Sequence, residues 1–382
     1  MTANLAPVQR AERIDVLDIL RGYALFAILI GNMETIRVPY FTPGYVESTR
    51  TAIDQLAFNF IHTTLGTELY LVFSFLFGLG FAVQIMRAKA KGIQSNALYL
   101  RRMGALFLIG VLHYLLIWDG DILRIYAVFG VVLLLLNVLP DRLLLIGSVV
   151  LLLISPVVAN VLSNVDLGGS SGDVLTQLTT VYSTGSYFDV VGYRISNFVP
   201  DFWAELTFDG LNVLAMFMLG MYAGRIRIFE NLSQYRNVFV IGLIGGLAAA
   251  IIGDILGISI IHRPGMAALH ICGITLVAMY PAWNKRLSVL IPFGRMSLSN
   301  YIVQNLVMTT IFYGYGLGQF EKMGAATALL ITITIGTVQM IYCAWWLQRF
   351  SFGPLEWLWR SLTYGKLMPM RRSTDKPAAE AA

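Results

Sequence analysis

Long apolar stretches recur along nearly the whole of this 382-residue sequence, and they constrain its fold more than any other feature. We place ten of them at approximately residues 16–33, 60–85, 104–118, 122–139, 143–163, 206–224, 238–258, 266–282, 290–313 and 324–347. A helix needs about 20 residues to cross a hydrocarbon core of about 30 Å, and these stretches lack the two-residue alternation of membrane strands. The sequence therefore predicts an all-α, polytopic membrane protein with about ten transmembrane helices.

The composition supports the same class of protein. Apolar residues make up 57% of the chain and charged residues only 13%, which excludes an ordinary water-soluble domain. We expect one transmembrane helical domain over residues 1–372 and a disordered cytoplasmic tail over 373–382. The longest polar connection, about 164–205, is expected outside the cell, either as a lid over an external site or as a solvated connector.

Basic residues fall mainly on one side of this predicted topology. With the N-terminus in the cytoplasm, 19 of the 27 Lys and Arg residues lie in cytoplasmic segments and five lie in external ones. Both termini are therefore predicted to be cytoplasmic, in a multi-pass protein of the bacterial inner (plasma) membrane. The net charge of +5 follows from this orientation, so the lipid bilayer is an expected partner and a nucleic acid is not.

Ionisable residues inside apolar segments are costly, so they normally face a bundle interior and mark a site or a pathway. The first segment contains Asp18 and Arg21 on one helix face, and Asn32 follows Arg21 by about three turns, or ~16 Å. These residues indicate a polar stripe along a site. The alternative is a structural Asp–Arg pair and an asparagine that ends the helix.

His113 lies in the third segment, shortly before Trp118, which is typical of the membrane interface. Asp119, Asp121 and Arg124 follow at the adjoining turn. Because either carboxylate could orient the imidazole, His113 is a candidate general base. A lone histidine that hydrogen-bonds a neighbouring helix is the alternative.

Polar residues at helical spacing also mark the ninth segment. The stripe consists of Ser297, Asn300, Tyr301 and Gln304, and Arg295 precedes it as a possible anion-binding group. Such a stripe either lines a cavity, with Asn300, Tyr301 and Gln304 contacting a substrate, or joins helices. Glu68 is a further, isolated candidate for substrate binding.

Three other features are expected to be structural. Cys272 and Cys343 lie within predicted helices, so we expect neither a disulfide nor a metal site. Small-residue pairs at Gly220/Gly224 and Gly253/Gly257 suit close helix packing and permit a homodimer. Residues 353–360 form an amphipathic interfacial segment with a Glu356/Arg360 pair.

Five short sequences resemble the YeiB family, bacterial membrane proteins described as a domain of unknown function. They are Leu17-Asp18-Ile19-Leu20-Arg21-Gly22 with Asn32, Phe73-Ser74-Phe75-Leu76-Phe77-Gly78-Leu79-Gly80, His113 with Trp118-Asp119-Gly120-Asp121-Ile122-Leu123, Gly294-Arg295-Met296-Ser297-Leu298-Ser299-Asn300-Tyr301, and Gly353-Pro354-Leu355-Glu356-Trp357-Leu358-Trp359-Arg360. The resemblance covers nearly the whole chain. The family is similar in fold to transmembrane acyltransferases, among them envelope-sugar O-acetylases and heparan-α-glucosaminide N-acetyltransferase. The resemblance therefore implies acyl transfer from cytoplasmic acyl-CoA to an acceptor across the membrane.

The resemblance leaves the catalytic base open. The O-acetylases have a histidine eleven residues after the arginine, whereas this chain has Asn32 after Arg21, as the heparan enzyme does. The catalytic histidine of that enzyme lies in the connection into its second helix, where His62 is the candidate here. His113, by contrast, belongs to a sequence typical of the YeiB family itself.

Three interpretations are compatible with these residues. In an acyltransferase, Arg21, Arg124 or Arg295 would hold the phosphates of acetyl-CoA or another acyl-CoA, and Asn32 with Asn300 would stabilise the oxyanion. His113, oriented by Asp119 or Asp121, would deprotonate a carbohydrate, lipid or small-metabolite acceptor without a metal. In a transporter of a small anionic or envelope metabolite, the same Arg and Asp residues would serve as the binding groups for the metabolite and as relay groups. A sensor or structural partner is the third interpretation.

Overall fold

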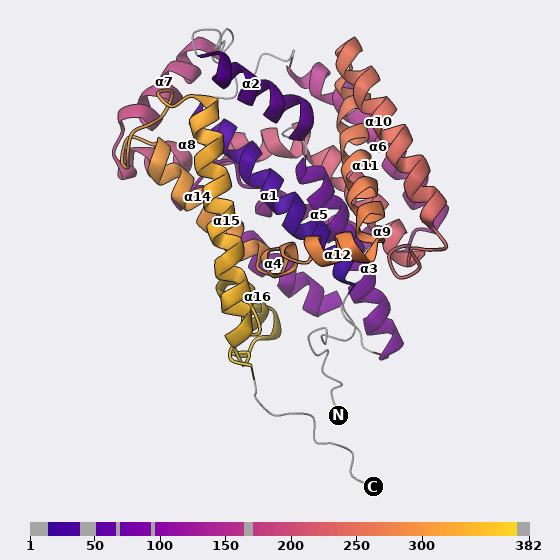
Figure 1. The fold of residues 1–382 in the computed structure, drawn as a ribbon. Helices are drawn as coiled ribbons and strands as arrows, with labels where there is room; N and C mark the ends of the chain where they lie inside the picture. The colour runs from indigo at the N-terminus through magenta and orange to yellow at the C-terminus, as the bar shows by residue number, and fades with distance from the viewer. Residues whose placement is uncertain (1–13, 39–50, 66–68, 93–95, 164–170, 373–382) are drawn as a thin grey trace.

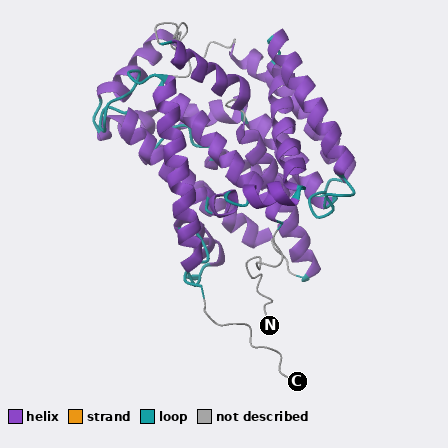
Figure 2. Ribbon diagram, viewed as in Figure 1, coloured by secondary structure: helices purple, strands orange, loops and turns teal. Residues whose placement is uncertain are grey.

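The protein is described by a computed structural model that places residues 14–38, 51–65, 69–92, 96–163 and 171–372. These residues form a bundle of helices without a strand (Figures 1 and 2). The elements are α1 (Asp15–Arg37), α2 (Ala52–Phe60), the π-helical turn η3 (Ile61–Leu65), α3 (Tyr70–Ala90), α4 (Asn96–Leu116), α5 (Leu123–Leu136), α6 (Asp141–Ser163), α7 (Ser171–Thr184), α8 (Tyr187–Phe208), α9 (Gly210–Arg225), α10 (Arg236–Leu256), α11 (Ser259–Ala278), α12 (Pro281–Leu287), α13 (Leu290–Arg295), α14 (Ser297–Phe312), α15 (Ala325–Arg349) and α16 (Pro354–Tyr364). The predicted all-α membrane architecture is confirmed.

The predicted count of about ten membrane spans is not confirmed. Within the described ranges, α1, α3, α4, α6, α10, α11 and α15 are long and apolar enough to cross a membrane, and the pair α8/α9, bent by 52°, would make an eighth span. The expected span 122–139 is the shorter helix α5, and 290–313 is divided at Met296 into α13 and α14. Hydropathy located these segments, but it does not detect a bend or a break.

Two helices occupy most of the segment that the sequence predicts as a long polar connection. α7 and α8 cover residues 171–184 and 187–208, and Ser186 starts α8 with a capping box that it forms with Asp189. The prediction of a loop over 164–205 is therefore wrong for these residues, because their apolar residues recur at helical spacing among polar ones. Residues 164–170, Glu68 and the tail from 373 lie outside the described residues.

Glycine packing joins α3 and α9. A Cβ at Gly220 would overlap the carbonyl oxygen of Phe75, and one at Gly224 would approach Ala82 Cβ to 2.7 Å. The predicted role of Gly220 and Gly224 in close packing is thus confirmed within the chain. Gly253 likewise packs against α11, whereas Gly257 ends α10 with a left-handed φ of 65° and is not a packing residue.

A second glycine contact joins the first and fourth of the short sequences described above. A Cβ at Gly22 would overlap the carbonyl oxygen of Leu290, and one at Gly294 would lie 2.6 Å from the backbone nitrogen of Gly22. α1 and α13 therefore pack with their backbones in contact. This contact holds Arg21 and Arg295 at the same end of the bundle.

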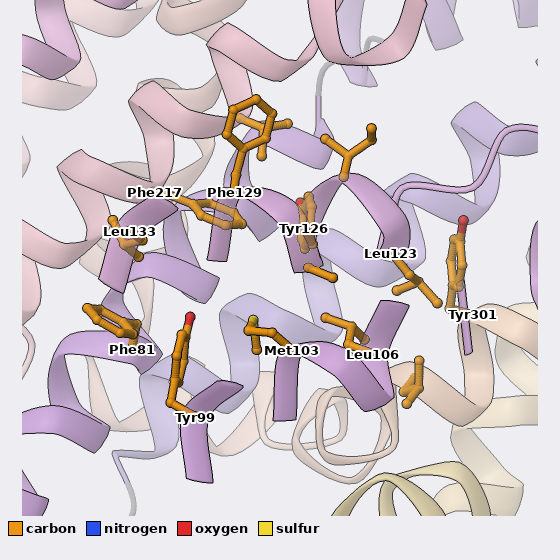
Figure 3. Packing of buried hydrophobic residues seen from close by; sticks show 14 of the residues in the cluster. Phe81, Tyr99, Met103, Leu106, Leu123, Tyr126, Phe129, Leu133, Phe217 and Tyr301 are labelled. Carbon is orange, nitrogen blue, oxygen red and sulfur yellow. The ribbon is translucent and has the colours of Figure 1, made fainter. Parts of the chain in front are cut away.

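The main hydrophobic core lies between α3, α4, α5 and α9. Phe77 stacks on Phe217 with ring centroids 4.7 Å apart, and the edge of Tyr126 packs against both rings. Figure 3 shows Tyr126, Phe217 and their neighbours in this cluster. Well-packed aromatic side chains of this kind make α3, α5 and α9 a firm support for residues at the ends of these helices.

Glu356 fixes α16 to the start of α14. Its Oε1 accepts hydrogen bonds from the backbone nitrogens of Leu298 (2.7 Å) and Ser299 (3.1 Å), and its Oε2 accepts one from Ser299 Oγ (2.6 Å). A carboxylate suits this position because the first N–H groups of a helix lack intrahelical partners. Arg360 stacks on Phe352 at 4.6 Å. The predicted interfacial segment is thus a helix that caps another helix.

We expect Glu356→Ala to lower the free energy of unfolding by about 1–2 kcal/mol, because the first turn of α14 loses its acceptor. Thermal unfolding of the detergent-purified protein, followed by tryptophan fluorescence, measures this loss. Glu230→Ala is the matched control, since Glu230 is partly exposed and lies 3.8 Å from Arg227. Equal stability of the two variants would contradict the capping role.

Candidate functional site

One cavity of about 1280 Å³ runs through the bundle and joins groups of opposite charge. At one end, which we name the basic end, it is lined by Arg21, Arg87, Arg102, Arg295 and Arg360, with the carboxylates of Asp18 and Glu356 among them. At the other, the acidic end, it is lined by Asp119, Asp201, Glu205 and Asp209, with Arg263 beside them. Apolar and aromatic side chains such as Leu25, Phe73 and Tyr126 line the part between.

The arginines of the basic end are held by neighbouring side chains. Arg21 forms an ion pair with Asp18 at 2.7 Å, and its side chain is 31% exposed. The guanidinium of Arg102 lies 4.4 Å from the ring centroid of Trp359 and donates a hydrogen bond to Gln84. Two guanidinium groups on α1 and α4 therefore face a shared space, which is a suitable arrangement for phosphates.

Tyrosine hydroxyls orient three of the four carboxylates of the acidic end. The hydrogen bonds run from Tyr182 to Asp119 (2.7 Å), from Tyr114 to Asp201 (2.6 Å) and from Tyr70 to Asp209 (2.9 Å). Burial, with the nearby Asp119 carboxylate, raises the pKa of Tyr182 well above its usual value, so this phenol remains a donor at neutral pH. Each carboxylate keeps further lone pairs for a ligand.

His113 lies beside the acidic end but does not line the cavity. Its side chain has no exposed surface, and Nδ1 lies 2.9 Å from Asp121 Oδ1. Nε2 lies 3.0 Å from Nδ2 of Asn305, whose Oδ1 accepts a hydrogen bond from Asn32 Nδ2 at 3.2 Å. Both ring nitrogens are engaged, so His113 is not placed to take a proton directly from a ligand in the cavity.

Arg124 joins this buried network to Glu205. Its backbone nitrogen donates to Asp121 Oδ2 at 2.9 Å, and its NH2 group lies 2.8 and 3.0 Å from the two oxygens of Glu205. The guanidinium carbon lies 3.8 Å from the ring centroid of Tyr114. Gly110 makes room for this arrangement, because a Cβ there would lie 2.7 Å from the Arg124 nitrogen.

The structure separates several residues that the sequence analysis grouped. Arg124 pairs with Glu205 at the acidic end and does not line the cavity, so the alternative in which Arg124 holds the phosphates does not fit. Tyr301 lines the cavity, and its ring centroid lies 5.0 Å from that of His113. His62 is exposed in η3, contacts Phe58 with its ring tilted by 42° and does not line the cavity.

The polar stripe of α14 both lines the cavity and joins helices, the two alternatives that the sequence left open. Ser297 and Tyr301 line the cavity. Asn300 instead donates to the carbonyl of Phe293 at 3.1 Å, and Gln304 donates to Gln339 of α15 at 2.9 Å. Asn300 and Gln304 therefore join helices, and the structure gives neither of them a place on the cavity wall.

Sequence reasoning missed Asn305, Glu205 and Arg102 as site residues. Asn305 follows Tyr301 by four residues, so helical spacing could have identified it. Glu205 lies at the end of the segment that the sequence predicts as a long polar connection, about 164–205. Arg102 was counted only as a cytoplasmic charge, because nothing local distinguishes an arginine that lines a cavity from one that faces water.

The fold and this cavity define a polytopic helical membrane protein with an internal site between a basic and an acidic end. Residues 223–366 match the family described as "Protein of unknown function (DUF418)". Over 97% of its length the chain is 35% identical to "Uncharacterized protein YxaH" of Bacillus subtilis (strain 168), covering 99% of that protein. It is also 26% identical to "Uncharacterized protein YeiB" of Escherichia coli (strain K12), over 96% of the chain and 100% of that protein. The protein belongs to this DUF418, or YeiB, family.

Proposed function

We propose that the protein is a transmembrane acyltransferase that transfers an acyl group from cytoplasmic acyl-CoA to an acceptor in the outer half of the bundle. The observation that supports this function best is a cavity with an excess of arginines at one end and an excess of carboxylates at the other. An acyl-CoA is also asymmetric, since its anionic phosphates lie at one end and its neutral thioester at the other. Such a donor can be held by charge at the basic end and react at the acidic end.

The distribution of basic residues supports a cytoplasmic position for the basic end. Five positive charges lie in the turn between α3 and α4 or within seven residues of it, more than near any other connection between two helices of the described residues: Arg87, Lys89, Lys91, Arg101 and Arg102. Positive loops are retained in the cytoplasm, where acyl-CoA is made. In this orientation Arg21 and Arg102 hold the phosphates, with Trp359 stacked beside Arg102.

Asn32 lies where the thioester would react. It is eleven residues beyond Arg21 on α1, or ~16 Å along the helix axis, a span that the extended pantetheine arm can bridge. Asn32, Asp119 and Tyr301 all line the cavity. A donated N–H at this point would stabilise the oxyanion of the tetrahedral intermediate.

The reaction balances with the groups present. The acceptor oxygen or nitrogen attacks the thioester carbonyl, and a carboxylate of the acidic end takes the acceptor's proton. Collapse of the oxyanion breaks the carbon–sulfur bond, and the proton returns to the sulfur as CoA leaves. Glu205, which lines the cavity and is oriented by Arg124, is the carboxylate linked to the His113 network.

We expect the purified protein to bind acetyl-CoA with micromolar affinity and Arg21→Ala to weaken this binding at least about tenfold, because one phosphate contact is lost. Isothermal titration calorimetry in detergent measures both constants, with free CoA as a second ligand. Arg236→Ala is the matched control, since Arg236 is exposed at the start of α10 and does not line the cavity.

Absence of acetyl-CoA binding by the folded protein would contradict an acyltransferase. A carrier of a small anionic or envelope metabolite would then be favoured, because a continuous cavity also suits transport. Reconstitution in proteoliposomes separates the two functions. A carrier accumulates its substrate unchanged, whereas an acyltransferase releases CoA and a modified acceptor.

A further inference from the structure

A chain of hydrogen bonds crosses the bundle behind the acidic end of the cavity. The first and the last residue of this hydrogen-bond chain line the cavity. The chain runs from Asn32 through Asn305, His113, Asp121 and Arg124 to Glu205. Asn32 and Glu205 line the cavity, whereas the four residues between them do not. The inner residues can therefore influence a ligand only through the two that face it.

The charge of Asp121 sets the direction of this chain. Oδ2 of Asp121 accepts hydrogen bonds from the backbone nitrogen and Nε of Arg124, and it forms an ion pair with this guanidinium at 3.4 Å. An ionised carboxylate only accepts hydrogen bonds, so Nδ1 of His113 must donate to it. In a neutral imidazole Nε2 then carries the lone pair and must accept a hydrogen bond.

The direction set at Asp121 is passed on through Asn305. Because Nε2 of His113 accepts, Asn305 must present its NH2 group to the ring and its oxygen to Asn32. Asn32 must in turn donate, so its NH2 group is held on the side of Asn305. One N–H of Asn32 is used in this bond, and the second has no partner among the described residues.

We propose that Asn305 and His113 are positioning residues that fix the orientation of the Asn32 amide at the cavity wall. Asn305 transmits the orientation of His113 to Asn32, whose second N–H is then available for the carbonyl oxygen of the donor. This inference rests on the proposed acyl transfer for its consequence in catalysis. The hydrogen-bond chain itself can be tested without any reaction.

The tautomer of His113 is the first test. The chain contains four histidines, so selective ¹⁵N-histidine labelling gives a spectrum in which His113→Gln identifies the His113 signals. We expect the proton on Nδ1 and a lone pair on Nε2, opposite to the tautomer that imidazole prefers in water. Asn305→Asp should place a proton on Nε2 as well, because a carboxylate there can only accept.

Thr309→Val is the matched control for these spectra. Thr309 is buried one turn beyond Asn305 on α14 and donates to the carbonyl of Leu306 in its own helix. The His113 signals should not change in this variant. A wild-type His113 with its proton on Nε2, or unchanged signals in folded Asn305→Asp, would overturn the proposed direction of the chain.

Thioester turnover tests the consequence for Asn32. We expect Asn305→Leu to lower kcat by about 10- to 100-fold with KM for acetyl-CoA unchanged, since oriented oxyanion donors act in the transition state. Thr309→Val should stay within about twofold of wild type. An unchanged kcat in folded Asn305→Leu would overturn the positioning role. If wild-type protein shows no turnover, the proposed function fails, and the tautomer measurement then decides the hydrogen-bond chain by itself.

Discussion

Replacing Asp121 by alanine is expected to lower the free energy of unfolding by about 3–5 kcal/mol, one of the largest effects of any single substitution in this protein. The side chains of Asp121, His113 and Arg124 have no exposed surface. Without the carboxylate, Nδ1–H of His113 and the backbone N–H of Arg124 lose their acceptor in an interior that offers no water. A buried positive charge on Arg124 is then balanced by Glu205 alone.

Chemical unfolding in mixed detergent micelles, followed by tryptophan fluorescence, measures this change. Asp141→Ala is the matched control, because Asp141 also pairs with an arginine, Arg225, but is 49% exposed on its side chain. Removal of an exposed partner of this kind costs less than about 1 kcal/mol. If the two variants were equally stable, the buried network would not contribute to the fold as described.

Gly220→Ala is expected to destabilise the protein by about 2–3 kcal/mol, because the added Cβ would overlap the backbone of Phe75 on α3. Backbone atoms cannot rotate away as a flexible side chain can, so α3 and α9 must move apart. Their separation would also disturb Tyr70 and Asp209, which join these helices at the acidic end with a hydrogen bond of 2.9 Å.

Gly104→Ala is the matched control for this substitution. Gly104 also lies inside a long apolar helix, α4, but a Cβ there meets no atom within 4 Å. Alanine at such a position is expected to be neutral or slightly stabilising, since it favours the helix. Thermal unfolding and the yield of monodisperse protein after size-exclusion chromatography compare the two variants. A Gly220→Ala protein as stable as Gly104→Ala would show that α3 and α9 are not in backbone contact.

The sequence was most informative where a single helix carries the signal. Hydropathy located the seven helices of the described residues that are each long and apolar enough to cross a membrane, but it missed α8. Such helices are detectable because a segment in lipid must satisfy its backbone hydrogen bonds internally. Spacing along one helix placed Asp18 with Arg21 and identified the polar face of α14. The predicted orientation depends on counts of basic residues in loops, and proteoliposome accessibility measurements remain its test.

The sequence was less informative about where a helix stops or bends. α13 and α14 are separated at Met296 because Gly294 packs against the backbone of α1, a contact with residues nearly 280 positions away. α8 and α9 bend by 52° where Asp209 leaves the helix to bond Tyr70 of α3. Such breaks depend on neighbouring helices, so a hydropathy pattern alone does not predict them. The count of about ten spans is not confirmed by the described residues, which contain seven helices, or eight spans with the bent pair, that could cross a membrane.

The sequence by itself determined that this protein is a helical membrane protein with polar residues in its helices, including His113 beside two carboxylates. Only the tertiary structure decided which of these residues line the cavity. Asn32 from α1 and Glu205 from α8 line the cavity, whereas His113 is closed off between Asp121 and Asn305. The physical reason is that a polar side chain in a transmembrane helix avoids lipid either by facing a cavity or by bonding to a partner on another helix. The sequence does not distinguish the two, because the partner is distant along the chain.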